Sequence, residues 1–245
     1  MLKLMKYEWM SRWKFFLGGI ILLTLLNFYI VTNSTTNIDP RVFGITSIVI
    51  FVAGIVLMVD HIGRMYNSLF KETGYLLFTT PLSGYKILGG KIITVIAECL
   101  GLSLYGILIT FIDYKILSRK IPEWQIDANI PSEAIIMIFK FFLACLLGYI
   151  IFLLMTYLSA VLAKSLFSVF KYGKLLSFVC FIIIGEILGK LVDLADRATA
   201  YSVQITTANG CAVDSISNEY FMISMCMISL LFMSTGYLLD RRMNL

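Results

Sequence analysis

Charged side chains are scarce in this sequence. Only 14% of its 245 residues are Asp, Glu, Lys or Arg, whereas 59% are hydrophobic. A soluble domain carries about 25% charged residues, because it has to cover its surface with groups that water solvates. The shortage of charge therefore excludes an ordinary soluble globule and indicates an integral membrane protein.

The sequence also has few of the residue types that build catalytic or metal sites. It contains one histidine, His61, and its five cysteines include no Cys-x-x-Cys pair. A zinc site needs several ligands at suitable spacing, and a Ser-His-Asp triad needs a histidine beside its nucleophile. We therefore predict no catalytic residue and no metal ligand, and we interpret His61 as a polar residue at the membrane interface.

A nucleotide-binding domain is missing as well. The stretches between the apolar blocks are shorter than the roughly 50 residues that a domain needs. The nearest match to the phosphate-binding pattern GxxxxGK[ST] runs from Gly84 to Lys91, but it is one residue too long and is followed by Ile92. We therefore expect a chain that is not an enzyme and holds no cofactor. The basic residues form no stripe with interleaved aromatics, so a nucleic-acid partner is not expected.

The hydrophobic residues lie in blocks of about 18–25 residues, the length that crosses a hydrocarbon core of about 30 Å. The blocks lack the period-two alternation of barrel strands, so we predict an all-α, polytopic fold with six transmembrane helices in a single domain, 1–245. No A-x-A site follows the first block, so we interpret it as a retained anchor. The predicted spans are Phe15–Val31, Val42–Ile62, Ile92–Ile112, Ala134–Ser159, Leu175–Val192 and Tyr220–Leu239.

The orientation follows from the basic residues, because Lys and Arg concentrate in cytoplasmic segments. With the N-terminus inside, only Arg41, Lys115, Arg119, Lys120 and Arg197 fall in outer segments. The inner segments then hold Lys3, Lys6, Arg12, Lys14, Arg64, Lys71, Lys86, Lys91, Lys164, Lys171, Lys174, Arg241 and Arg242. We therefore predict that both termini are cytoplasmic.

The connection 63–91 between the second and third spans is long, since helix–helix connections usually have about 2–8 residues. It combines apolar residues with Lys71, Glu72 and Pro81, which keep it out of the bilayer core. Pro81 disfavours helix at Thr80 and is well suited to start the next element. The pattern predicts a short cytoplasmic helix before Pro81, which either lies on the lipid surface or docks into a partner.

This connection resembles the corresponding loop of ABC-2 type transporter permeases. The resemblance rests on Phe70-Lys71-Glu72-Thr73-Gly74-Tyr75, on Leu76-Leu77, on Thr80-Pro81-Leu82-Ser83 and on Gly90-Lys91. The layout of six spans, a basic N-terminal segment, a long outer stretch at 193–219 and a basic tail is also similar. Where the family often has Thr-Leu-Glu after the glycine, this chain has Tyr75-Leu76-Leu77.

The resemblance implies a membrane subunit of an ATP-driven exporter in the bacterial cytoplasmic membrane. A separate ATPase subunit, which holds ATP and magnesium, would seat the connection 63–91 as its coupling helix, and a second permease copy or a paralogue would complete the pore. The segment 1–14 would be an interfacial connecting helix, 163–174 a smaller second contact, and 193–219 would hold short re-entrant or lid helices. The residues implied for the ATPase contact are Phe70, Lys71, Glu72, Thr73, Gly74, Tyr75, Leu76, Thr80, Pro81, Leu82 and Ser83.

The substrate class also comes from the resemblance. Small permeases of this layout are similar to those of Gram-positive peptide exporters, including the phenol-soluble-modulin exporter, which implies an amphipathic peptide or another hydrophobic substrate. Two other classes stay open. A secondary transporter or channel would show broken inverted repeats, which the sequence lacks, and a non-transporting immunity or assembly factor would have no ATPase partner.

Three ionisable residues within the predicted spans are candidates for a substrate cavity. Such groups are costly in lipid, so they face a cavity or pair with each other. Glu98 is interpreted either as a cavity-lining group or as a protonated partner in a helix–helix hydrogen bond. Glu186 and Lys190 are four residues apart, which favours a local ion pair over substrate contact. Gly185 and Gly189 form a GxxxG pattern, which permits close packing within the chain or between two chains.

Overall fold

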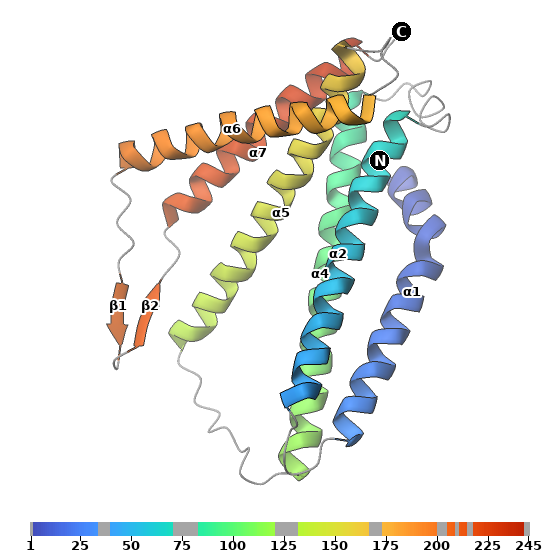
Figure 1. The fold of residues 1–245 in the computed structure, drawn as a ribbon, viewed down its shortest axis with the longest axis vertical. Coiled ribbons are helices and arrows are strands. Elements are labelled where there is room, and N and C mark those ends of the chain that lie inside the picture. The colour runs from blue at the N-terminus through green and yellow to red at the C-terminus, as the bar shows by residue number, and fades with distance from the viewer. Residues whose placement is uncertain are drawn as a thin grey trace. The chain divides into compact units, whose positions relative to one another are not determined.

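A computed structural model describes residues 2–33, 40–70, 83–120, 132–166, 173–199, 205–208, 211–214 and 218–242 of the chain. The described part is helical apart from one short hairpin (Figure 1). Its elements are α1 (Leu2–Asn33), α2 (Pro40–Phe70), α4 (Gly84–Lys120), α5 (Ser132–Leu166), α6 (Gly173–Thr199), β1 (Ile205–Ala208), β2 (Cys211–Asp214) and α7 (Asn218–Arg242).

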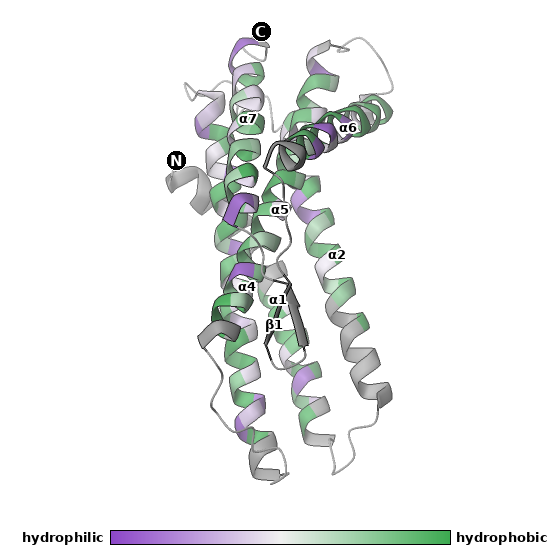
Figure 2. Ribbon diagram, turned by 90° about the vertical axis from the view of Figure 1, so that its left-hand side faces the viewer, coloured by the Kyte–Doolittle hydropathy of each residue, from purple (hydrophilic) through white to green (hydrophobic). Residues whose placement is uncertain are grey.

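In the described part of the chain, four helices are long and apolar enough to cross a membrane. These stretches are Gly84–Ile116, Ile135–Ser165, Leu175–Leu194 and Asn218–Arg241. Within the described part of α1 a shorter apolar stretch, Leu17–Tyr29, is found. Figure 2 shows hydrophobic residues along most of the length of the described helices. The membrane character predicted from composition is thus confirmed, and the count of six spans stays a prediction.

The chain divides into two compact units. The first comprises Met1–Asp60 and Gly90–Asn129, and the second comprises His61–Gly89 and Ile130–Leu245. Both α2 and α4 therefore contribute one part to each unit. The prediction of a single transmembrane domain stays a prediction beside this division.

The N-terminal segment does not form a helix of its own. The predicted interfacial helix at 1–14 and the predicted first span belong to one continuous helix, α1. Neither Pro nor a turn signal separates the two stretches in the sequence, so nothing interrupts the backbone hydrogen-bond ladder. On this helix Trp9 and Trp13 are both exposed.

The connection between the second and third spans is shorter than the predicted 63–91. Helix α2 continues to Phe70 and α4 begins at Gly84, so both ends of the predicted connection are helical. Ser83 precedes α4, and its carbonyl accepts hydrogen bonds from the backbone N–H groups of Lys86 at 2.9 Å and Ile87 at 3.2 Å. The residues between, 71–82, lie outside the described part of the chain, and so does the predicted helix before Pro81.

The stretch before the last helix differs from what the resemblance implies. Helix α6 continues to Thr199, and β1 pairs antiparallel with β2 in the register Ile205↔Asp214 to Ala208↔Cys211. Strands therefore stand where lid helices were expected within 193–219. β-branched residues such as Thr206, Thr207 and Val213 favour this extended conformation.

The core of the second unit lies along the C-terminal half of α5, which packs against both α6 and α7. Leu153, Leu154, Tyr157 and Val161 are almost fully buried there. Figure 1 shows that α6 runs across α5 at a steep angle instead of lying along it. One bilayer normal therefore cannot be parallel to both of these apolar helices.

Candidate functional site

The end of α2 is held against α5 by a lysine. The ammonium group of Lys164, near the end of α5, donates a hydrogen bond to the backbone carbonyl of Leu69. It also lies 5.8 Å from the ring centroid of Phe70, within the range of a cation–π interaction. Met65 and Leu69 are buried beside it. Phe70, the first residue of the predicted ATPase contact, is thus joined to Lys164, which belongs to the predicted second contact at 163–174.

The start of α4 is held against the end of α7. The backbone N–H of Gly84 donates to the carboxylate of Asp240. Because the first N–H groups of a helix have no partner within it, a carboxylate here both satisfies a donor and complements the positive end of the helix. Ile87 and Leu88 on the next turn are buried.

Two glycines permit this close approach of α4 and α7. A Cβ atom on Gly84 would lie 2.5 Å from Cβ of Leu239 and 3.1 Å from the backbone nitrogen of Asp240. On the partner helix, a Cβ atom on Gly236 would overlap the ring of Tyr85. The Tyr85 ring also lies 6.1 Å from that of Phe232. We call Gly84, Tyr85, Gly236 and Asp240 the α4–α7 clasp.

Both helical ends that flank 71–83 are therefore fixed within the second unit, one on α5 and the other on α7. The start of α6 belongs to the same end of this unit, because a Cβ on Gly173 would lie 3.5 Å from the ring of Phe70. The ends of α2, α5 and α7 and the starts of α4 and α6 are those that the basic residues predict to be cytoplasmic. The side of the membrane that these helix ends face stays a prediction.

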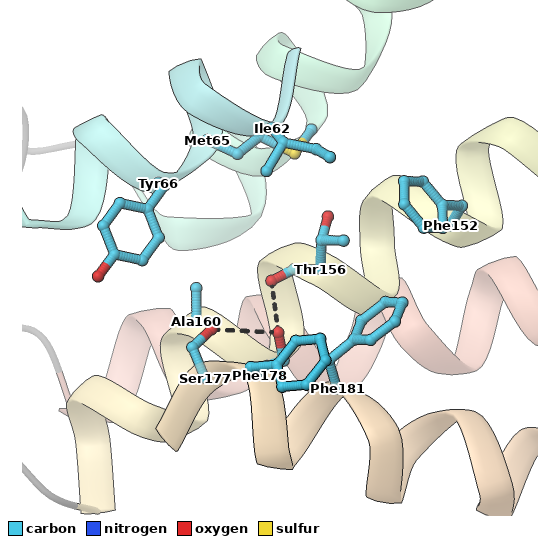
Figure 3. Close-up of a pocket in the computed structure, with 10 residues that line it drawn as sticks. Ile62, Met65, Tyr66, Phe152, Thr156, Ala160, Ser177, Phe178 and Phe181 are labelled. Carbon is cyan, nitrogen blue, oxygen red and sulfur yellow. Dashed lines mark hydrogen bonds between the residues drawn. The ribbon is translucent and has the colours of Figure 1, made fainter. Parts of the chain in front are cut away.

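A cavity of about 440 Å³ lies in the second unit between α2, α5 and α6 (Figure 3). Its volume is within the usual range of ligand pockets, about 300–1,000 Å³. None of the described residues that line it is charged. The lining consists of Ile62, Met65, Tyr66, Phe152, Thr156, Ser159, Ala160, Ser177, Phe178 and Phe181.

Three hydroxyls of this lining already have hydrogen-bond partners. Thr156 donates to the carbonyl of Leu153 and Ser159 to that of Thr156, each at 2.8 Å. Ser159 and Ser177 are linked across α5 and α6 at 3.4 Å. Tyr66 stacks on Phe70 with ring centroids 4.2 Å apart, and it lies beyond the predicted end of the second span. Burial raises the pKa of its hydroxyl above the ordinary 10.0, so the group is neutral near pH 7.

The single histidine is buried and paired, and its predicted position at the membrane interface stays a prediction. His61 is only 2% exposed, and its Nδ1 atom is hydrogen-bonded to the hydroxyl of Tyr149 on α5 at 2.5 Å. The two rings lie 5.8 Å apart. His61 thus joins α2 to α5. Along α2 this contact lies about two turns before the contact of Leu69 with Lys164. Within the described residues, no group of three His, Cys, Asp or Glu side chains forms a metal site.

The predicted substrate carboxylates belong to different units of the chain. Glu98 is buried in the first unit, whereas Glu186 and Lys190 are exposed on α6 of the second. None of the three belongs to the lining of the cavity in Figure 3. Among the described side chains, no ion pair joins Glu186 to Lys190, and the expected local pair stays a prediction.

Of the two glycines in the GxxxG pattern, only Gly185 lies close to a neighbouring helix among the described residues. A Cβ on Gly185 would lie 3.4 Å from the terminal methyl group of Met155 on α5, whereas nothing lies within 4 Å of one on Gly189. Gly185 therefore serves packing within the chain, and Gly189 leaves an open surface.

The first unit contains a polar seam between α1 and α4 that the sequence interpretation missed. The side-chain amide of Asn27 donates to both carboxylate oxygens of Asp113, at 2.8 and 2.9 Å. One turn away, the hydroxyls of Thr24 and Tyr105 are hydrogen-bonded at 2.6 Å. A polar residue on an apolar helix is a signal for such a partner, but the sequence does not reveal which residue it is.

A second cavity, of about 360 Å³, lies within the first unit. Residues of α1, α2 and α4 line it, and all of them are glycine, alanine or aliphatic: Gly19, Ile20, Leu22, Leu23, Ile48, Val52, Ala53, Val56, Leu57 and Leu102. Glu98 is not among them, so the described cavities give neither of its two interpretations an advantage.

The residues of the clasp were not predicted as a group. Gly84 and Asp240 are 156 positions apart, and a single sequence contains no signal that pairs them. In the comparison with known proteins, no family model, curated protein or solved structure matches the chain.

Proposed function

We propose that this chain is the membrane-spanning permease subunit of an ATP-driven exporter of the ABC-2 type. The observation that supports it best is the double anchorage of the segment 71–83. This segment carries most of the residues that the resemblance implies for the ATPase contact, which we call the coupling pattern. The flanking helical ends are fixed on α5 by Lys164 and on α7 by Asp240. A push on the segment would therefore be passed directly to two apolar helices.

The stiffness of both anchors supports this role. Leu69 and Leu88, beside the two anchors, are almost fully buried, and close-packed interiors transmit displacement instead of absorbing it. At Gly84 and Gly236 the helices α4 and α7 are in close contact, so a shift of the start of α4 would also move α7. If the ends of the segment were not packed against other helices, its displacement would not reach them.

In this proposal the chain does not hydrolyse ATP. A separate ATPase subunit binds the nucleotide and magnesium and seats Lys71–Ser83 in a groove, while a second permease copy or a paralogue completes the pathway. The protein lies in the bacterial cytoplasmic membrane with both termini inside, as the basic residues predict.

The substrate class that fits is an amphipathic peptide or a similar hydrophobic molecule. The cavity of the first unit has apolar walls, which suits a molecule with a large apolar surface.

A binding experiment in native membranes tests the proposal. The full chain, purified in mild detergent from its own membrane, should bring a P-loop ATPase with it at one-to-one stoichiometry. Glu72→Arg reverses a charge at the centre of the coupling pattern and should release the ATPase. Glu219→Arg, at the exposed start of α7, is the matched control and should retain it. An ATPase that is absent, or that stays bound to both variants, would refute the proposal.

A further inference from the structure

The cavity between α2, α5 and α6 is large enough to hold a ligand. Its volume is about 440 Å³. For comparison, an apolar cavity of about 150 Å³ holds one benzene molecule, so this cavity has room for a group of roughly 15 carbon atoms.

The walls of the cavity favour a hydrocarbon. The hydroxyls of Thr156 and Ser159 donate to backbone carbonyls of their own helix, and Ser177 is linked to Ser159. In Figure 3 the Tyr66 ring points away from Phe152 and Phe181. Because the hydroxyls of Thr156, Ser159 and Ser177 already have partners and no charged residue is among the described lining, a polar ligand would lose its own hydration without compensation.

One end of the cavity has a cation beside it. Lys164 follows the lining residue Ala160 by one helical turn on α5. Its contacts Leu69 and Phe70 follow Met65 and Tyr66 by one turn on α2. The ammonium group thus lies one turn beyond the apolar lining on both helices. It has three donors, of which the bond to Leu69 uses one, so two can reach an anion.

We propose that this cavity binds one acyl chain of an anionic phospholipid from the surrounding membrane, with the lipid phosphate beside Lys164. The helices α5 and α6, which form most of the lining, are long and apolar enough to cross a membrane. The surrounding bilayer therefore supplies the acyl chain, and the charge of Lys164 selects the headgroup. This site does not depend on an ATPase partner, so its test is separate from that of the proposed function.

The direct test is photolabelling of the full-length chain in phosphatidylcholine vesicles. The probe is a trace of phosphatidylglycerol with a photoreactive diazirine on its acyl chain, and the adducts are mapped by peptide mass spectrometry. We expect label on α5 at Phe152–Ala160 and on α6 at Ser177–Phe181. The same diazirine on phosphatidylcholine should label these residues about fivefold less, the difference that one lysine makes for an anionic lipid.

Two variants separate the chain from the headgroup. Ala160→Phe fills the cavity and should abolish labelling there, whereas Val179→Phe adds a ring on an exposed position of α6 and should not. Lys164→Gln should lower phosphatidylglycerol labelling to the level of phosphatidylcholine and leave the latter unchanged. If Ala160→Phe does not fold, the adduct map of the natural chain still decides.

Three results would overturn the proposal. The first is label spread evenly over exposed positions of α6 such as Ile182 and Ile183. The second is unchanged labelling in folded Ala160→Phe. The third is equal labelling of the natural chain by the two lipids.

Discussion

The backbone N–H of Gly84 donates a hydrogen bond to the carboxylate of Asp240, which lies 156 positions further along the chain. The first residue of one apolar helix is thereby capped by the last turn of another. The contact fixes where α4 begins, just after the segment that carries the coupling pattern.

Removal of this cap should destabilise the start of α4. We expect Asp240→Ala to lower the free energy of unfolding by about 1 kcal/mol, the usual cost of losing a capping side chain. Asp240→Asn keeps an acceptor oxygen and should lose less. Hydrogen exchange of the Gly84 amide in detergent measures the effect, and exchange should be faster in Asp240→Ala. Asp193→Ala, at an exposed position of α6, is the control; equal exchange at Gly84 in both variants would contradict the cap.

The two glycines of the clasp should differ from other glycines in these helices. Gly84→Ala would force Cβ onto Leu239 and the backbone of Asp240, and Gly236→Ala onto the ring of Tyr85. We expect each to cost about 1–3 kcal/mol, the usual range for overpacking. Chemical unfolding in detergent gives these free energies.

A matched control and a rescue sharpen this prediction. Gly101→Ala, where nothing lies within 4 Å of the new Cβ, should be neutral or stabilising by up to about 1 kcal/mol, because alanine favours helix. Adding Tyr85→Leu should restore part of the stability of Gly236→Ala and none of that of Gly84→Ala. A cost that is the same at all three glycines would show that α4 and α7 do not approach closely.

The helices could be predicted from the sequence, but their ends could not. The apolar blocks predicted six membrane helices. In the described part of the chain, four helices are long and apolar enough to cross a membrane. Hydropathy reports only the part of a helix that lipid would cover, so it missed the continuation of α2 to Phe70 and of α6 to Thr199. Hydropathy also contains no information on how two helices cross, so it did not predict that α6 runs across α5.

The hairpin had a sequence signal that the family resemblance obscured. Asn209-Gly210 stands between two short stretches with β-branched residues, and Asn-Gly is the strongest local signal for a two-residue hairpin. The register Ala208↔Cys211 places two residues between the strands, as this signal requires. The contacts of Lys164, His61 and Asp240 had no such signal, because long-range pairing depends on how the helices pack.

The contact of Lys164 with the end of α2 should control how tightly that end is held. Lys164→Met keeps an unbranched apolar stem but removes the hydrogen bond to Leu69 and the charge over Phe70. We expect a loss of about 1 kcal/mol in stability and faster proteolysis within 71–82 in detergent. Lys190→Met, at an exposed position of α6, should change neither. Proteolysis at equal rates in the two variants would argue against the anchor.

The polar seam of the first unit should show coupling between its two members. Asn27 donates to both oxygens of Asp113, so removal of either side chain leaves the other without its partner. Interhelical hydrogen bonds in membrane proteins contribute about 0.6 kcal/mol on average and up to about 1.7 kcal/mol. Because Asn27 bonds both carboxylate oxygens, this pair should lie near the upper value. A double-mutant cycle with Asn27→Leu and Asp113→Leu, measured by unfolding in detergent, gives the coupling energy.

The cycle of Asn27→Leu with Thr110→Val is the control, because the Thr110 hydroxyl bonds only within its own helix. Additive effects in both cycles would mean that α1 and α4 are not joined at Asp113.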